Sequence, residues 1–147
     1  ILMLSFFVPV IMAMAGNTGI QSSTLIVRSL ALKTIDEDGV SKLLLRELSA
    51  GALMGLISGI LAGIWSSFIG GNDSVIPSLY LAVTVGVSLF SAMMFAAVFG
   101  AFAPLFLNKI KADPAVASGP FVTASNDILA LLIYYGVAIS LIFSYVS

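Results

Sequence analysis

The residue with the clearest chemical potential is a single carboxylate in an apolar part of the sequence. Asp127 is the only charged residue beyond Asp113. A charged side chain inside a membrane helix costs about 3 kcal/mol on insertion scales, so it usually faces a cavity, a partner or an ion. The residues that share its helical face are Gly119 and Thr123 before it and Ala130 after it. Because Asn126 is also polar, this segment combines one carboxylate with amide and hydroxyl groups, as a site for a cation requires.

A second polar group lies in the first apolar stretch. Asn17, Gln21, Thr24 and Arg28 follow one another at i, i+4, i+7 and i+11, which places them in one stripe along a helix. Lipid cannot satisfy the hydrogen bonds of these side chains, so the stripe should face protein or water. Two polar half-helices, one of which carries a carboxylate, are what a hydrated cation pathway requires.

Plainer roles remain open for both groups. Residues 128–147 alone are long enough to cross a membrane, in which case Asp127 would only cap the helix at the interface. Alternatively, Asp127 would form a buried structural ion pair with Arg28. The stripe from Asn17 to Thr24 would equally serve as polar contact between helices.

Missing residue types restrict the chemistry further. The sequence contains no cysteine and no histidine, and its net charge is −1. Thiol chemistry, zinc, haem and iron–sulfur sites are therefore excluded, and any metal must be a hard ion held by oxygen atoms. Without histidine no Ser–His pair is available, and with one membrane carboxylate per chain no aspartyl dyad is available within a chain. We therefore predict that the protein is not an enzyme.

The elements that carry these residues are predicted to be transmembrane helices. Hydrophobic residues make up 60% of the chain and charged residues 9%, whereas soluble domains carry about 25% charged residues. We predict an all-α, polytopic transmembrane helix bundle with four helices in this chain, at residues 1–32, 48–69, 75–107 and 114–146. The last two segments exceed the length that a bilayer needs. We expect the third to tilt, protrude or bend, with a bend nearest Gly100 and Pro104, and the fourth to break at residues 118–120.

The connections between these segments predict an orientation. All six basic residues lie in or beside the connections at 33–47 and 108–113, and none lies in the connection at 70–76. By the positive-inside rule, the first two connections are cytoplasmic, whereas residues 70–76 and the C-terminus lie outside. The acidic residues at 36–38 are expected to form a solvated turn that ends at Gly39, and residues 40–48 to start a helix near the membrane surface.

Small residues predict how two of the helices pack. Gly51, Gly55, Gly59 and Gly63 repeat every four residues in the second segment, and Ala92, Ala96 and Gly100 do so in the third. Such stripes let neighbouring membrane helices approach closely, so we interpret them as structural.

Two stretches resemble the membrane domain of the MgtE family of magnesium channels. They are residues 16–28, GNTGIQSSTLIVR, and residues 113–123, DPAVASGPFVT, the latter followed by Asn126-Asp127 and by LLIY at 131–134. The order of the connections, with LLREL at 44–48 before a glycine-rich helix, is also similar. Together the two stretches cover about a fifth to a quarter of the chain.

The resemblance implies a homodimer with five transmembrane helices per subunit and an ion path at the dimer centre. Residues 1–147 would then be the transmembrane ion-permeation domain, without the first helix and without cytoplasmic regulatory domains. In this family Asp127 would contact Mg²⁺. The other metal-site residues that the resemblance implies are Gly119 and Thr123 on the same helix and Gln21, Thr24 and Asn17 on the partner helix. Asn126 and Ala130 would be pore-lining.

These inferences lead to one predicted function and two alternatives. We predict a magnesium-selective channel or transporter of the cytoplasmic membrane, which moves hydrated divalent cations through a pore between two copies of the chain. Magnesium suits the site because it usually keeps several waters and binds through one or two carboxylates. The alternatives are a proton- or sodium-coupled secondary transporter that uses Asp127 as a relay, and a structural membrane subunit without a pathway.

Overall fold

In the computed structural model, which describes residues 2–33, 37–69 and 77–146, every regular element is a helix. The elements are α1 (Leu2–Ser5), α2 (Val8–Ala31), α3 (Glu37–Ile69), α4 (Ser78–Lys109), the 3₁₀ helix η1 (Pro114–Ser118) and α5 (Pro120–Val146). Helices α2, α3, α4 and α5 are each long and apolar enough to cross a membrane. The predicted all-α transmembrane bundle is therefore confirmed.

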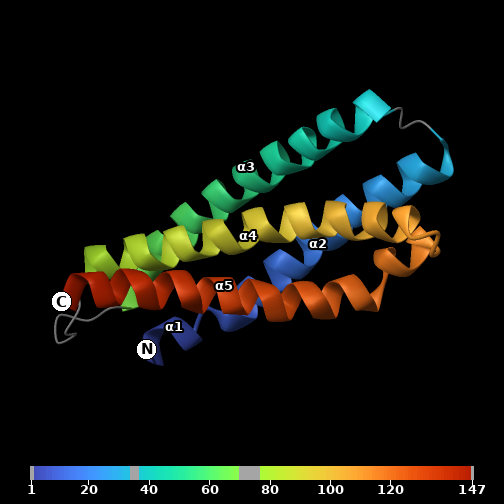
Figure 1. Ribbon diagram of the computed structural model, residues 1–147. Helices are drawn as coiled ribbons and strands as arrows, with labels where there is room; N and C mark the ends of the chain where they lie inside the picture. The colour runs from blue at the N-terminus through green and yellow to red at the C-terminus, as the bar shows by residue number, and fades with distance from the viewer. Residues whose placement is uncertain (1, 34–36, 70–76, 147) are drawn as a thin grey trace.

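Helix α4 is the central element of the bundle. It packs against α3, α2 and α5, whereas α3 and α2 meet only slightly (Figure 1). Apolar side chains of α1, α2, α4 and α5 form the main core, which includes Ile11, Leu89, Met93 and Tyr134. Helix α3 lies along the outside of α4, and most of its large apolar side chains are exposed, as expected for a lipid-facing helix.

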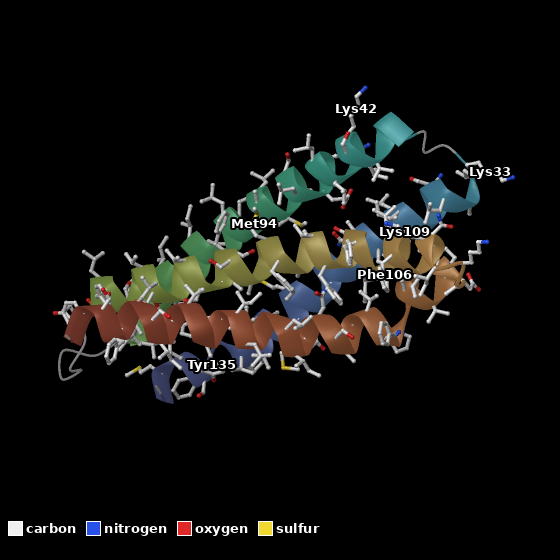
Figure 2. All side chains as sticks on the ribbon, viewed as in Figure 1. Lys33, Lys42, Met94, Phe106, Lys109 and Tyr135 are labelled. Carbon is white, nitrogen blue, oxygen red and sulfur yellow. The ribbon has the colours of Figure 1, made fainter. Side chains whose placement is uncertain are left out.

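The two ends of the bundle differ in charge. The end of α2, the start of α3, the end of α4 and η1 lie together at one end, and both chain termini lie toward the other (Figure 1). Lys33, Lys42 and Lys109 all lie at the first end (Figure 2). The two basic connections recognised in the sequence are therefore on the same side of the bundle.

The glycine stripe of α3 packs closely against α4, as predicted. A Cβ atom placed on Gly59 would lie 2.6 Å from the carbonyl oxygen of Gly86, and one on Gly63 would lie 2.8 Å from that of Ala82. Both distances are too short for a real side chain. The stripe therefore allows backbone-to-backbone contact, which is how small residues stabilise helix pairs in lipid.

The two long segments differ in continuity. Helix α4 continues through Gly100 and Pro104, so the tilt or bend expected near these residues stays a prediction. A membrane helix tolerates this proline because neighbouring groups can satisfy the freed backbone. The predicted break at residues 118–120 is confirmed, because η1 ends before Gly119, whose backbone is extended, and α5 begins at Pro120. Proline is favoured in a first turn because its missing N–H has no partner there.

The starts of the first two segments differ in outcome. The first segment is divided at residues 6–7, and α2 begins at Val8 with Pro9 in its first turn. The helix start predicted at residues 40–48 is confirmed, because these residues belong to α3, which begins at Glu37. Residues 37–39 belong to the backbone of α3, so the turn predicted at 36–38 does not extend over residues 37 and 38. Asp36 lies outside the described residues.

Candidate functional site

The site is formed where α2 and α5 pack together around Asp127. A Cβ atom on Gly16 would lie only 2.8 Å from Oδ1 of Asp127 and 3.6 Å from Cγ2 of Thr123. Only glycine at position 16 leaves room for this carboxylate in its present position. Gly19 lies on the same face of α2, three residues further along, and faces Asn126.

The position of Asp127 rules out both plain roles that the sequence allowed. Asp127 lies two turns inside α5, about 10 Å along the axis from Pro120, so it is not an N-cap. Arg28 is twelve residues beyond Gly16 on α2, about 18 Å along the axis, which is too far for an ion pair. Asp127 is half-buried, and its Oδ1 is buried without a hydrogen-bond partner. A buried carboxylate oxygen without a partner requires an explanation, and a bound ion or water would supply the missing partner.

An open pocket of about 520 Å³ adjoins this carboxylate. Its walls are formed by Ile20, Gly119, Pro120, Thr123, Ala124 and Asp127. The hydroxyl of Thr123 donates a long hydrogen bond of 3.5 Å to the carbonyl oxygen of Gly119. The structure thus brings three of the predicted site residues, Gly119, Thr123 and Asp127, into one pocket wall.

The predicted stripe on α2 lies outside the pocket wall, where Ile20 takes the place expected for polar groups. Asn17, Gln21, Thr24 and Arg28 are all exposed on the surface of the chain. Within one chain, this stripe does not act as polar contact between helices. Its side chains are available for water, an ion or another copy of the chain.

Contacts between helices are made instead by the alternate polar residues of α2. The hydroxyl of Ser22 donates to Oε2 of Glu47 on α3 at 2.7 Å, and that of Ser23 donates to the carbonyl oxygen of Ala117 in η1 at 2.6 Å. Ser23 thereby holds η1, and the Gly119 turn that follows it, against α2. Helix α2 therefore has two polar faces. The inward face, with Ser22 and Ser23, bonds to other elements of the bundle, whereas the outward face, with Asn17, Gln21 and Thr24, is exposed.

Asn126 and Ala130, both predicted to line a pore, lie inside the bundle with no exposed surface. Successive residues on a helix are about 100° apart, so α5 cannot present positions 126 and 127 in the same direction. Asn126 points toward α4, where its Nδ2 donates to the carbonyl oxygen of Ala96 at 3.4 Å.

Three residues at the site were not recognised from the sequence as functional. Gly16 accommodates the Asp127 side chain and Gly19 that of Asn126. The i, i+3 spacing of these two glycines beside Asn17 is the sequence signal that could have identified them. Glu47 is 4% exposed and accepts the hydrogen bond of Ser22. No local signal marks Glu47, because it directly follows Arg46 in a charged stretch of the sequence.

The chemistry of the pocket is that of oxygen ligands only. The described residues contain no group of three or more carboxylates that could hold a metal ion, so they do not form an all-protein metal cage. One carboxylate with a hydroxyl and a carbonyl nearby suits a hard ion that keeps most of its water.

Comparison with known proteins identifies the family. Residues 8–137 match the MgtE family, described as a divalent cation transporter. The chain is 37% identical over 141 residues to the magnesium transporter MgtE of Bacillus subtilis, covering 96% of this chain and 30% of that protein. It is 39% identical over 138 residues to that of Thermus thermophilus, covering 92% of this chain and 28% of the relative. The chain thus spans less than a third of the length of these relatives. Since the match covers most of its residues, the chain belongs to the MgtE family of divalent cation transporters.

Proposed function

We propose that this chain forms the membrane pathway of a magnesium channel or transporter, in which Asp127 binds the passing Mg²⁺ through its water shell. The observation that carries this proposal is the Oδ1 atom of Asp127, which is buried, unpartnered and part of a carboxylate that borders an open pocket inside a membrane-spanning helix. Keeping a charge at such a position is costly unless an ion or a partner uses it. The magnesium transport of the named relatives supports the same reading.

The size and lining of the pocket suit a hydrated ion. Six water molecules at about 30 Å³ each occupy roughly 180 Å³, and the pocket holds about 520 Å³. Magnesium gives up its water reluctantly and binds through one or two carboxylates. The hydroxyl of Thr123 and the carbonyl oxygen of Gly119 would accept hydrogen bonds from the water shell.

A second copy of the chain would complete the pathway. Asn17, Gln21 and Thr24 are exposed beside the pocket, although lipid cannot satisfy their hydrogen bonds. If this stripe faced the same stripe of a second copy across a water-filled path, water would satisfy these hydrogen bonds. The same arrangement would bring two Asp127 carboxylates to one ion. The exposed polar surface on a membrane helix thus supports a homodimer with a central pore.

The location of the site within the membrane follows from the charge distribution. The basic end of the bundle would face the cytoplasm of a bacterial-type cytoplasmic membrane by the positive-inside rule. Residues 33–47 and 108–113 are then cytoplasmic, and residues 70–76 and the C-terminus lie outside. The Asp127 pocket, two turns from the start of α5, would lie in the cytoplasmic half. Residues 1–147 would accordingly act as the transmembrane ion-permeation domain of the protein.

Magnesium uptake into liposomes tests this proposal. The protein is reconstituted as wild type, as Asp127→Asn and as Asp113→Asn, and uptake is followed with an enclosed magnesium-sensitive dye. Asp113→Asn is the matched control, because Asp113 is an exposed carboxylate that caps η1 by accepting from the backbone N–H of Ala115, and asparagine caps equally well. We expect Asp127→Asn to abolish most uptake and Asp113→Asn to retain it.

Unchanged uptake by Asp127→Asn would refute the role of this carboxylate. The measurement is repeated without any pH or sodium gradient. Wild-type uptake that stops when these gradients are removed would contradict the passive pathway and would indicate a coupled transporter.

A further inference from the structure

The neighbour of Asp127 in the sequence occupies an unusual position. Asn126 is completely buried at the junction of α2, α4 and α5. Its Nδ2 donates one long hydrogen bond of 3.4 Å to the carbonyl oxygen of Ala96, and its Oδ1 is buried without a partner. Burying an amide with an unsatisfied acceptor costs free energy. Stability of the bundle alone therefore does not account for an amide here.

The junction is shaped around this amide. A Cβ atom on Gly19 would overlap Nδ2 of Asn126 and lie 2.7 Å from its Cγ. A Cβ atom on Gly100 would overlap the carbonyl oxygen of Gly19. Two glycines thus let α2 and α4 touch through their backbones, and the space in front of Gly19 is filled by the Asn126 side chain.

This contact fixes the rotation of α5 about its own axis. Asn126 fits against Gly19, and the following residue, Asp127, fits against Gly16 one turn away on the same face of α2. Since residues 126 and 127 are rigidly about 100° apart on α5, moving one moves the other. A metal site needs its ligand held to about 0.5 Å by neighbouring residues.

We propose that Asn126 is a positioning residue, which sets the direction of the Asp127 carboxylate by filling the space left by Gly19 between α2 and α4. Asn126 does not contact the ion. The proposal rests on the proposed function, in which Asp127 binds Mg²⁺ through its water shell. It replaces the pore-lining role that the sequence suggested for Asn126.

Two measurements test the proposal, and the second does not depend on magnesium. The first is the Mg²⁺ concentration that half-saturates uptake into liposomes, compared for wild type and Asn126→Leu. Leucine has the same side-chain branching as asparagine, but it replaces the amide oxygen and nitrogen with two methyl groups. The second uses the absence of cysteine from the sequence. Asp127→Cys provides a single thiol whose rate of modification by a water-soluble methanethiosulfonate reports the direction of side chain 127, with and without Asn126→Leu.

Thr84→Val is the matched control. Thr84 is 1% exposed on α4, and its Oγ1 is also buried without a partner. It lies twelve residues from Ala96, about 18 Å along the helix. Thr84→Val thus removes a buried polar group of the same kind at a distance from the site.

We expect Asn126→Leu to raise the half-saturating Mg²⁺ concentration roughly tenfold, since changing the residues that orient a metal ligand typically costs tenfold or more in affinity. We expect the thiol at position 127 to change its modification rate in the same variant. Thr84→Val should change neither quantity. The proposal is overturned if Asn126→Leu leaves the modification rate unaltered, or if Thr84→Val shifts both quantities as much as Asn126→Leu does.

A second set of variants keeps the test decisive if Asn126→Leu does not fold. Gly19→Ala should shift both quantities, because the added methyl group displaces the amide. The double variant Gly19→Ala with Asn126→Ala should give the same half-saturating Mg²⁺ concentration and the same thiol modification rate as Asn126→Ala alone. The reason is that the amide which the added methyl group would displace is then missing. Effects that simply add would overturn the proposal. If Asp127→Asn leaves uptake unchanged, the proposed function fails, and the thiol measurement still decides whether Asn126 positions residue 127.

Discussion

Replacing Gly16 by alanine should separate the function of the site from the stability of the fold. The added Cβ atom would lie 2.8 Å from Oδ1 of Asp127, which is closer than a carbon and an oxygen atom can remain. The other two nearest atoms, Cγ2 of Thr123 and Cγ of Asp127, are at 3.6 and 3.8 Å, which are ordinary contact distances. The conflict therefore involves only the end of one flexible side chain, and the carboxylate has to turn away by several tenths of an ångström.

The expected size of the effect follows from this geometry. Turning a side chain about 30° from its preferred rotamer costs roughly 0.5–1.5 kcal/mol. If Mg²⁺ binding requires the present direction of the carboxylate, this cost appears as a loss of roughly two- to twelve-fold in apparent affinity. Helix propensity acts in the opposite direction on stability, because alanine is favoured over glycine by about 1 kcal/mol inside a helix.

The assay compares the half-saturating Mg²⁺ concentration for uptake with the thermal midpoint of unfolding in detergent. We expect Gly16→Ala to raise the former and to leave the latter unchanged or higher. Gly136→Ala is the control, since nothing lies within 4 Å of the added Cβ atom there. Wild-type uptake by Gly16→Ala would refute the reasoning about the carboxylate. A large fall in the thermal midpoint would show that the backbone, and not the side chain, has to move.

Further predictions concern the packing around the site. Gly100→Ala should lower the thermal midpoint and the yield of folded protein, because its Cβ atom would overlap the backbone of Gly19, which cannot turn away. The expected loss in the free energy of unfolding is about 1–3 kcal/mol. A midpoint equal to wild type would contradict the close helix contact. Ser22→Ala should destabilise the protein by about 1–3 kcal/mol, because it removes the hydroxyl that donates to the buried Glu47 carboxylate. Adding Glu47→Leu should restore part of this loss in the same unfolding measurement, and strictly additive effects would show that the two side chains are not coupled.

Several features of the protein follow from local residue chemistry and were therefore predictable from the sequence. The four membrane helices follow from apolar length, because a helix that crosses lipid must satisfy its backbone internally and cover about 30 Å. The break before Pro120 follows from proline and glycine chemistry. The close packing of α3 follows from its glycine repeat. Thr123 and Asp127 share one pocket wall because they are four residues apart on α5, and Gly119 directly precedes that helix.

Features that depend on contacts between helices were decided only by the tertiary structure. Spacing placed Asn17 and Gln21 on one stripe, but it could not tell that this stripe faces outward while Ser22 and Ser23 face inward. A helix start at residues 40–48 was predicted from the sequence, and only the structure showed that α3 begins at Glu37.

The same distinction holds at the carboxylate with which the sequence analysis began. Hydropathy and composition alone identified Asp127 as a charge that needs an explanation, because its cost in lipid depends on its own residue type and depth. Which way it points depends on its partners on other helices. Gly16 leaves the space for it, and Asn126 occupies the space in front of Gly19, so the roles of two adjacent polar residues separate only when α2 and α5 pack together.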